Sequence, residues 1–140
     1  MAAANPNTVS CKAYPGSNLA VRDNENRPYL APANPNDPHQ QWYKYGNENA
    51  PFSLVNKASN QALQHLPDYA IVTLVPYNPP DESVLWALGQ VDDEGYGPII
   101  TPHVALYLEA DDGGATIKVG NFVYENDNQL WKLSPTIEYL

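Results

Sequence analysis

Three tryptophans recur along the chain at Trp42, Trp86 and Trp131, at spacings of 44 and 45 residues. The segments that end at the first two, LAPANPNDPHQQW and LVPYNPPDESVLW, share a leucine, two prolines, an asparagine and an aspartate without any gap. The third copy is looser, but it closes with NDNQLWKL, which echoes QQWYK. A period of this length that takes up nearly the whole chain constrains the fold before any strand or helix is assigned.

Short β-type runs separated by turn residues fill each period. The chain has 14 prolines and 8 glycines in 140 residues, which interrupt it too often for long helices. Alternating or β-branched runs recur about every 8–12 residues, as in all-β sandwiches and barrels. They are TVSCKAY, NLAVRD, PFSLVN, QALQHL, AIVTLVPY, PIITP, VALYLEA, ATIKVG, NFVYE and QLWKL.

The repeat number favours one all-β architecture over its competitor. Three repeats of about four strands each predict a β-trefoil with pseudo-threefold symmetry, in which the three tryptophans are equivalent core residues. A sandwich with an internal duplication is the alternative, but it accounts for two similar units better than for three. We expect a short lead over residues 1–8 and one trefoil domain over 9–140, with repeats at about 9–46, 47–90 and 91–134.

Charge and cysteine content restrict the partners and the compartment. The chain has 16 acidic and 7 basic residues, a net charge of −9, so nucleic acid and anionic membranes are poor partners. It has no apolar run long enough to span a membrane. The first ten residues lack the basic and apolar regions of a secretory signal. Cys11 is the only cysteine, which excludes an internal disulfide and fits a reducing compartment, so we expect a cytoplasmic or nuclear protein.

Motifs for catalysis or metal binding are missing from the sequence. The acidic runs Asp92–Glu94 and Asp111–Gly114 could suggest calcium, but they lack the spacing of an EF-hand and are typical of turns. His39, His65 and His103 lie in different repeats without metal-ligand spacing. No nucleophile elbow, phosphate loop or His/Cys pair occurs. We expect no metal, no cofactor and no enzyme activity.

Four segments carry a resemblance to a known family. QQWYK, FSLVNKASNQALQH, VTLVPYNPPDESVLWAL and NDNQLWKL resemble the Euonymus-lectin family of plant carbohydrate-binding domains, a branch of the ricin-B-like trefoil lectins. The resemblance runs from about Thr8 to Ser134. It implies a non-enzymatic sugar-binding domain of the nucleus and cytosol, with galactosides and mannose-type glycans as usual ligands.

Sugar recognition needs three kinds of chemical group. A pyranose presents vicinal hydroxyls on one edge and a patch of C–H groups on one face. A carboxylate accepts from two hydroxyls, an amide both donates and accepts, and an aromatic ring covers the apolar face. In ricin-B-like sites the acid follows a leucine by three residues, the ring sits on the next strand, and the amides precede the tryptophan.

The resemblance carries most of this set onto the third repeat. Leu106-Tyr107-Leu108-Glu109 places Glu109 at the acid position, with Asp111 or Asp112 as substitutes. Phe122 is the first candidate for the ring and Tyr124 the second, and Asn128 and Gln129 fill the amide positions. Two alternatives stay open: the amides could close a turn, and one face of NFVYE could belong to the core.

The first two repeats lack the set, so we expect one working site. The first repeat offers Arg22 and Asp23 for the acid, Ala31 near the ring position, and His39 and Gln40 for the amides. The second repeat offers Leu66, Val75 and the pair Ser83 and Val84 at these positions. Neither has a stacking ring by this alignment.

The predicted function is a lectin that binds galactoside- or mannose-type glycans through the third repeat. A single shallow site favours a homodimer, because linked sites raise avidity. One rival is a protein-interaction module of the protease-inhibitor kind, with Tyr69 and Tyr96 in exposed loops. Another is a storage or stress protein whose sugar site has decayed.

Overall fold

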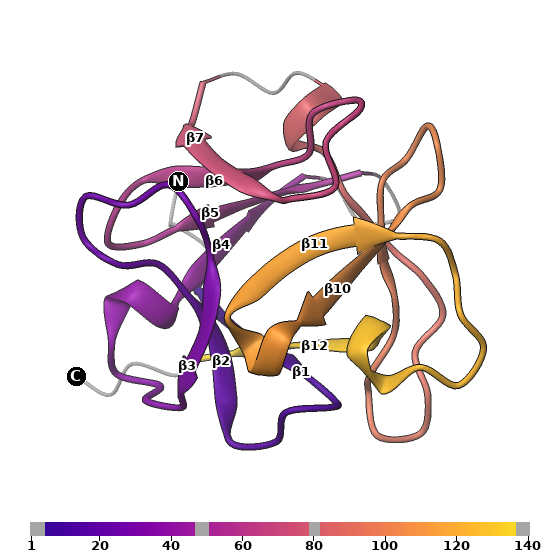
Figure 1. Cartoon of the computed structure of the whole chain (residues 1–140). Helices are drawn as coiled ribbons and strands as arrows, with labels where there is room; N and C mark the ends of the chain where they lie inside the picture. Colours follow the sequence, from indigo (N-terminus) through magenta and orange to yellow (C-terminus); the bar gives the residue numbers. More distant parts are fainter. Residues whose placement is uncertain (1–4, 47–50, 79–81, 137–140) are drawn as a thin grey trace.

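The computed structural model describes residues 5–46, 51–78 and 82–136. This part of the chain contains short strands joined by turns and by four single-turn 3-10 helices (Figure 1). The 3-10 helices are η1 (Pro38–Gln40), η2 (Glu82–Val84), η3 (Asp112–Gly114) and η4 (Asp127–Gln129). The strands are β1 (Asn7–Cys11), β2 (Ser17–Ala20), β3 (Tyr29–Pro32), β4 (Trp42–Tyr45), β5 (Ser53–Asn56), β6 (Gln61–Gln64), β7 (Thr73–Pro76), β8 (Ala87–Leu88), β9 (Ile99–Ile100), β10 (Tyr107–Asp111), β11 (Thr116–Gly120) and β12 (Trp131–Pro135).

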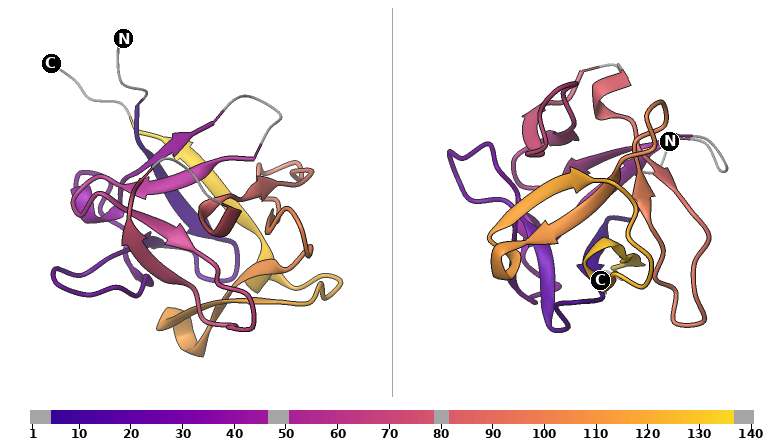
Figure 2. Two further views of the ribbon diagram at one scale, coloured as in Figure 1. Left: turned by 90° about the horizontal axis from the view of Figure 1, so that it is seen from above. Right: turned by 45° about the vertical axis from the view of Figure 1, so that its right-hand side comes forward.

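Six of the strands close into a barrel. β12, β1, β4 and β5 are neighbours in one antiparallel sheet, and β8 pairs with β9 in another. The antiparallel bridges Phe52–Trp86 and Gly97–Trp131 join these two sheets at both edges. The first and last strands, β1 and β12, lie side by side and pair over their whole length (Figure 2).

The other six strands form three hairpins that are spaced around the centre of the molecule: β2–β3, β6–β7 and β10–β11 (Figure 1). Their registers are equivalent, since each pair recurs at the spacing of the tryptophans. The pairs Asn18–Ala31, Ala62–Val75 and Tyr107–Gly120 correspond, as do Ala20–Tyr29, Gln64–Thr73 and Glu109–Lys118. The predicted β-trefoil is therefore confirmed, with four strands in each third.

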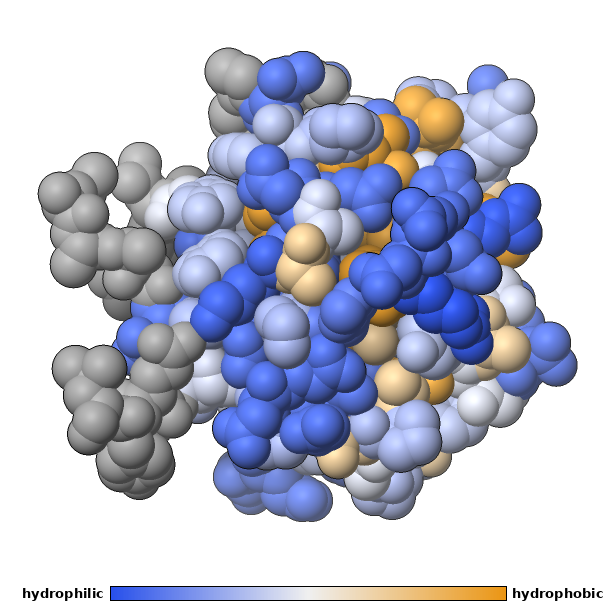
Figure 3. Space-filling model, turned by 90° about the vertical axis from the view of Figure 1, so that its left-hand side faces the viewer, coloured by the Kyte–Doolittle hydropathy of each residue, from blue (hydrophilic) through white to orange (hydrophobic). Residues whose placement is uncertain are grey.

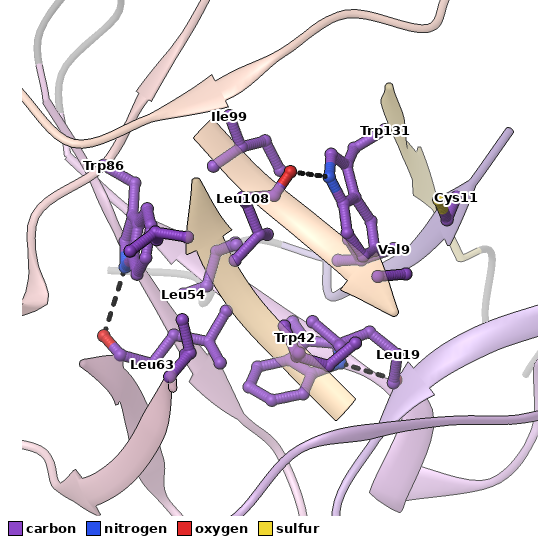
Figure 4. Packing of buried hydrophobic residues seen from close by; sticks show 14 of the residues in the cluster. Val9, Cys11, Leu19, Trp42, Leu54, Leu63, Trp86, Ile99, Leu108 and Trp131 are labelled. Atoms are coloured by element: carbon purple, nitrogen blue, oxygen red, sulfur yellow. Dashed lines mark hydrogen bonds between the residues drawn. The ribbon is translucent and has the colours of Figure 1, made fainter. Parts of the chain in front are cut away.

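The three tryptophans lie at equivalent places in one core. Trp42, Trp86 and Trp131 are each fully buried. Each indole donates its Nε1–H to the carbonyl of a buried leucine 23 residues earlier (Figure 4). These partners are Leu19, Leu63 and Leu108, at 2.9, 3.1 and 2.9 Å. The buried N–H groups are thus satisfied, as a buried donor requires.

One predicted strand is wrong. NFVYE is a loop, because β11 ends at Gly120. Phe122, Val123 and Tyr124 are all exposed, although alternation in a strand would bury one face. The N–H of Val123 donates to the side chain of Gln129 instead of a neighbouring strand. Neither aromatic residue of this loop therefore belongs to the core.

Cys11 belongs to the core, and polar residues cover much of the surface. Cys11 is free and buried, and burial raises the pKa of its thiol to about 11, so it stays protonated as a core residue. The face drawn in Figure 3 is mostly hydrophilic, with apolar atoms visible in patches. Among the described residues, no helix has the length and apolar character needed to cross a bilayer.

Candidate functional site

The outer face of the β10–β11 hairpin carries the predicted acidic residues. Alternation along β10 turns Leu108 and Ala110 into the core and leaves Tyr107, Glu109 and Asp111 outside. On β11 the same alternation exposes Lys118 opposite Glu109. We name the surface formed by Tyr107, Glu109, Asp111, Lys118, Gly120 and Phe122 the third-repeat face.

Glu109 is held in place at the centre of this face. Its Oε1 accepts from Nε2 of Gln129 at 2.8 Å, and its Oε2 lies 3.5 Å from Nζ of Lys118. The side chain is 16% exposed. A carboxylate fixed from two sides loses little conformational freedom when it accepts further hydrogen bonds, so this is a preorganised acceptor.

Asp111 and Lys118 form the charged end of the face. Their charged atoms are 3.0 Å apart. The hydrogen bond from Lys118 lowers the pKa of the Asp111 carboxyl, and the same bond raises the pKa of the Lys118 ammonium. Both groups therefore stay ionised at neutral pH, and Asp111 is 53% exposed. Two carboxylates against one ammonium leave an excess of hydrogen-bond acceptors at this end.

Gln129 is buried and serves to position other groups. Its Nε2 donates to Glu109 and to the carbonyl of Asn121 at 2.7 Å, and its Oε1 accepts from Val123 N–H. Both amide hydrogens are thus used within the protein. Gln40 makes the equivalent bonds in the first repeat, to the Pro32 carbonyl and from the Asn34 N–H. This arrangement supports the structural alternative for Gln129.

Asn128 has its hydrogen-bond partners outside the third-repeat face. Its Nδ2 donates to the carbonyl of Ala110 at 2.8 Å and to the hydroxyl of Tyr14 at 3.3 Å. These partners lie at the junction between the third and first repeats. The amide hydrogens of Asn128 are thus directed to Ala110 and Tyr14, and its place in one site with Glu109 stays a prediction.

The two candidate rings differ in what they contact. The ring of Phe122 lies 5.2 Å from the ring of Tyr107, and its side chain is 60% exposed. Phe122 thereby extends the third-repeat face beyond Gly120. Tyr124 is 78% exposed in the following turn. Asp112 is exposed at the hairpin tip, with a positive φ of 53°. The structure brings Phe122, Glu109 and Asp111 onto one face, and leaves Tyr124 and Asp112 at its margins.

Gly120 keeps the face open and was missed by sequence reasoning. A Cβ built at Gly120 would lie 3.3 Å from Oε1 of Glu109. The paired positions of the other hairpins hold Ala31 and Val75. Lys118 and Tyr107 were missed as well. The signal that could have found all three is the period-two pattern of TIKVG and YLEAD, which places alternate residues on one side.

The hairpin registers correct the alignment of the repeats. Glu109 corresponds to Ala20 and Gln64. Arg22 and Leu66, which were expected at the acid position, lie two residues after Ala20 and Gln64 and therefore correspond to Asp111. At the spacing of the tryptophans, Phe122 corresponds to Ala33 and Tyr77. The second repeat therefore does have an aromatic ring, and it stacks on Tyr45 at 5.4 Å.

His39 takes the place of Asn128 in the first repeat and provides a pH-dependent contact. Its Nε2 lies 2.7 Å from Oδ1 of Asp23, and its Nδ1 lies 3.0 Å from Oδ1 of Asp37. The hydrogen bond to Asp23, followed by that to Asp37, raises the pKa of His39 above 6.5. The imidazolium therefore adds stability that is complete below the unfolded-state pKa of about 6.5 and is lost as pH rises through the folded-state pKa.

We expect His39→Ala to lower the melting temperature more at about pH 5.5 than at about pH 8.5, since only the protonated ring forms both ion pairs. Thermal unfolding followed by circular dichroism at the two pH values measures the difference. Asp23→Asn is the matched control and should reduce this pH dependence, while the part that comes from Asp37 remains. An equal loss for His39→Ala at both values would contradict the expected ion pairs.

The three equivalent hairpins and the closed barrel define a β-trefoil domain. No protein-family model matches the chain. The Oryza sativa subsp. japonica protein Ricin B-like lectin R40G3 is 37% identical over 149 residues, which cover 91% of this chain and 72% of that protein. Ricin B-like lectin EULS3 of Arabidopsis thaliana is 36% identical, covering 91% of this chain and 46% of that protein. The chain therefore belongs to the ricin B-like lectin family.

Solved structures agree on the fold. The designed 3-fold symmetric protein ThreeFoil superposes with a TM-score of 0.79 at 20% identity, covering 94% of this chain and 99% of that one. Macrolepiota procera ricin B-like lectin, solved with lactose, gives a TM-score of 0.76 at 14% identity, covering 97% of this chain and 99% of that one.

Another Oryza sativa subsp. japonica relative, Ricin B-like lectin R40C1, is longer, and this chain spans 42% of its length.

Proposed function

We propose that this domain is a lectin that binds galactoside- or mannose-type glycans through the third-repeat face. The observation that carries the proposal is the Glu109 carboxylate, which Gln129 and Lys118 fix beside Gly120, a residue with no side chain to cover it. The exposed ring of Phe122 lies on the same face. A fixed acceptor beside an exposed ring matches the edge and the face of a pyranose.

In this proposal Glu109 accepts from one or two sugar hydroxyls, and Phe122 covers the C–H face of the ring. Asp111 adds a second acceptor, and Lys118 offers a donor between the two carboxylates. Gln129 acts indirectly, since it holds both Glu109 and the loop that carries Phe122. Asn128, Asp112 and Tyr124 contribute less in this arrangement than the sequence predicted. Binding is reversible and no bond of the sugar is broken.

The names of similar proteins support glycans as partners. The relatives are named lectins, and the fold recurs in SeviL bound to an asialo-GM1 saccharide, at 12% identity and a TM-score of 0.75. We propose glycoproteins of the cytoplasm or nucleus as targets. A homodimer would raise avidity by linking two third-repeat faces.

A glycan array tests this function. The intact protein should give saturable binding to galactoside- or mannose-type glycans, and Phe122→Ala should weaken it. Absence of any saturable signal would refute the lectin function and favour a protein-interaction or storage role. Saturable binding that is unchanged in Phe122→Ala would leave a lectin but reject the third-repeat face as its site.

A further inference from the structure

A concave site, separate from the third-repeat face, lies between the second and third repeats. It is a groove of about 850 Å³. Its walls are formed by residues within 65–70, 82–85 and 101–106, together with Val119. Val119 is buried on the inner side of β11, whereas Lys118 faces outward. The groove and the third-repeat face therefore lie on opposite sides of the same hairpin.

The floor of the groove is apolar and its mouth is acidic. Leu85, Leu106 and Val119 supply apolar surface, and Leu106 packs against the main core. Glu82 and Asp68 supply carboxylates. Such a combination of an apolar floor with few polar groups is typical of small-molecule sites.

The threefold symmetry allows the groove to be compared with the equivalent position between the third and first repeats. At the junction between the third and first repeats, the loop after β1 carries Tyr14, which packs against the core. The Tyr14 hydroxyl accepts from Nδ2 of Asn128 at 3.3 Å. Asn128 in η4 corresponds by the tryptophan spacing to Ser83 in η2, a residue that lines the groove. At the junction between the third and first repeats, the phenol ring of Tyr14 therefore occupies the position that corresponds to the groove.

In the third repeat the equivalent loop leaves that place open. The loop that follows β9 carries His103 and Val104 in place of an inward aromatic ring. The side chain of His103 is 63% exposed and lies 3.2 Å from the Glu82 carboxylate, and Val104 is also 63% exposed. Both side chains therefore line the groove at its exposed rim and leave its interior open.

The charged residues at the mouth of the groove determine which ligand charge it favours. Burial lowers the pKa of His65, so this groove residue is uncharged at neutral pH. His103 is paired with Glu82. Asp68 and the net charge of −9 add negative potential. A neutral or cationic compound is favoured over an anion.

We propose that the groove between the second and third repeats binds a small phenol, neutral or cationic, in the place that Tyr14 fills at the junction between the third and first repeats. The phenol ring lies on Leu106, Leu85 and Val119, and its hydroxyl points toward η2, as the Tyr14 hydroxyl points toward η4. This site is independent of sugar binding on the third-repeat face.

Three para-substituted phenols that differ in charge test the proposal on the 15N-labelled full chain. p-Cresol is neutral, tyramine is cationic and 4-hydroxyphenylacetate is anionic. We expect saturable amide shifts at Tyr69, Val104 and Leu106 with the first two probes. The anion should bind about twofold to fivefold more weakly, the size expected for an exposed like-charge contact. Absence of saturable shifts at these residues, or equal binding of the anion, would overturn the proposal.

A variant that supplies its own ring provides the second test. Val104→Tyr should place a phenol in the groove and weaken p-cresol binding about tenfold or more, which corresponds to about 1.4 kcal/mol. Val91→Tyr, at another exposed valine in the loop between β8 and β9, is the matched control and should bind normally. Unchanged p-cresol binding in folded Val104→Tyr would reject the site. The shift map of the unaltered protein decides the matter if that variant does not fold.

Discussion

Replacing Trp131 by alanine is expected to lower the free energy of unfolding by about 3–5 kcal/mol, the range for removal of a buried large aromatic side chain. Trp131 is fully buried and forms a bridge with Gly97 that helps to close the barrel. The substitution also removes the donor to the Leu108 carbonyl. Denaturant unfolding followed by fluorescence and circular dichroism measures the change.

Symmetry provides the controls for this prediction. Trp42→Ala and Trp86→Ala should cost a similar amount, because both indoles are fully buried and make the equivalent bond. Trp131→Phe keeps a ring but leaves the Leu108 carbonyl without its donor, so it should cost less, about 1–3 kcal/mol. A loss below about 1 kcal/mol for Trp131→Ala, the size of an ordinary substitution, would contradict an equivalent role in one core.

Glu109→Gln is expected to weaken glycan binding about 10-fold to 100-fold, because a hydrogen bond to a charged acceptor contributes about 1.5–3 kcal/mol. The amide keeps the size of the side chain but loses the negative charge and one acceptor. Isothermal titration with the best glycan of the array measures the loss. The melting temperature should change little, because the amide oxygen can still accept from Gln129 and the lost contact with Lys118 is long, at 3.5 Å.

Gln64→Ala is the matched control, because Gln64 occupies the position of Glu109 in the second hairpin. Its Nε2 donates to Oγ of Ser83, and the variant should bind glycans as the parent does. Equal weakening in both variants would mean that the second repeat also binds sugar. Loss in Gln64→Ala alone would move the site to the second repeat.

The fold could be predicted from the sequence because the regular spacing of the three tryptophans reflects three equivalent structural units. Each tryptophan needs a buried carbonyl acceptor at a fixed distance in the chain, so the spacing of the indoles reports the spacing of the hairpins. The NFVYE strand was predicted wrongly for a local reason. Its alternating apolar residues fit a strand, but Gln129, from the segment before Trp131, ties this loop down through Val123 and Asn121.

The composition of the candidate site could be predicted only in part. Leu106 and Leu108 both precede an acid by three residues, giving Glu109 or Asp111, and both acids face outward because they are two residues apart in one strand. Sequence pattern alone cannot choose between them. Asn128 was grouped with the acids by its place before Trp131, yet it bonds to Tyr14, which is 114 residues away. Such long-range partners leave no periodic trace in the sequence.

The central claim is a single sugar site on the third-repeat face, and amide chemical-shift mapping tests it most directly. Titration of the 15N-labelled chain with methyl β-galactoside and methyl α-mannoside should shift residues in β10, β11 and the loop with Phe122. Gly120→Val, which brings in the residue of the equivalent Val75, should abolish these shifts by crowding Glu109. Saturable shifts confined to the β2–β3 or β6–β7 hairpin, or no shifts with either sugar, would contradict the claim.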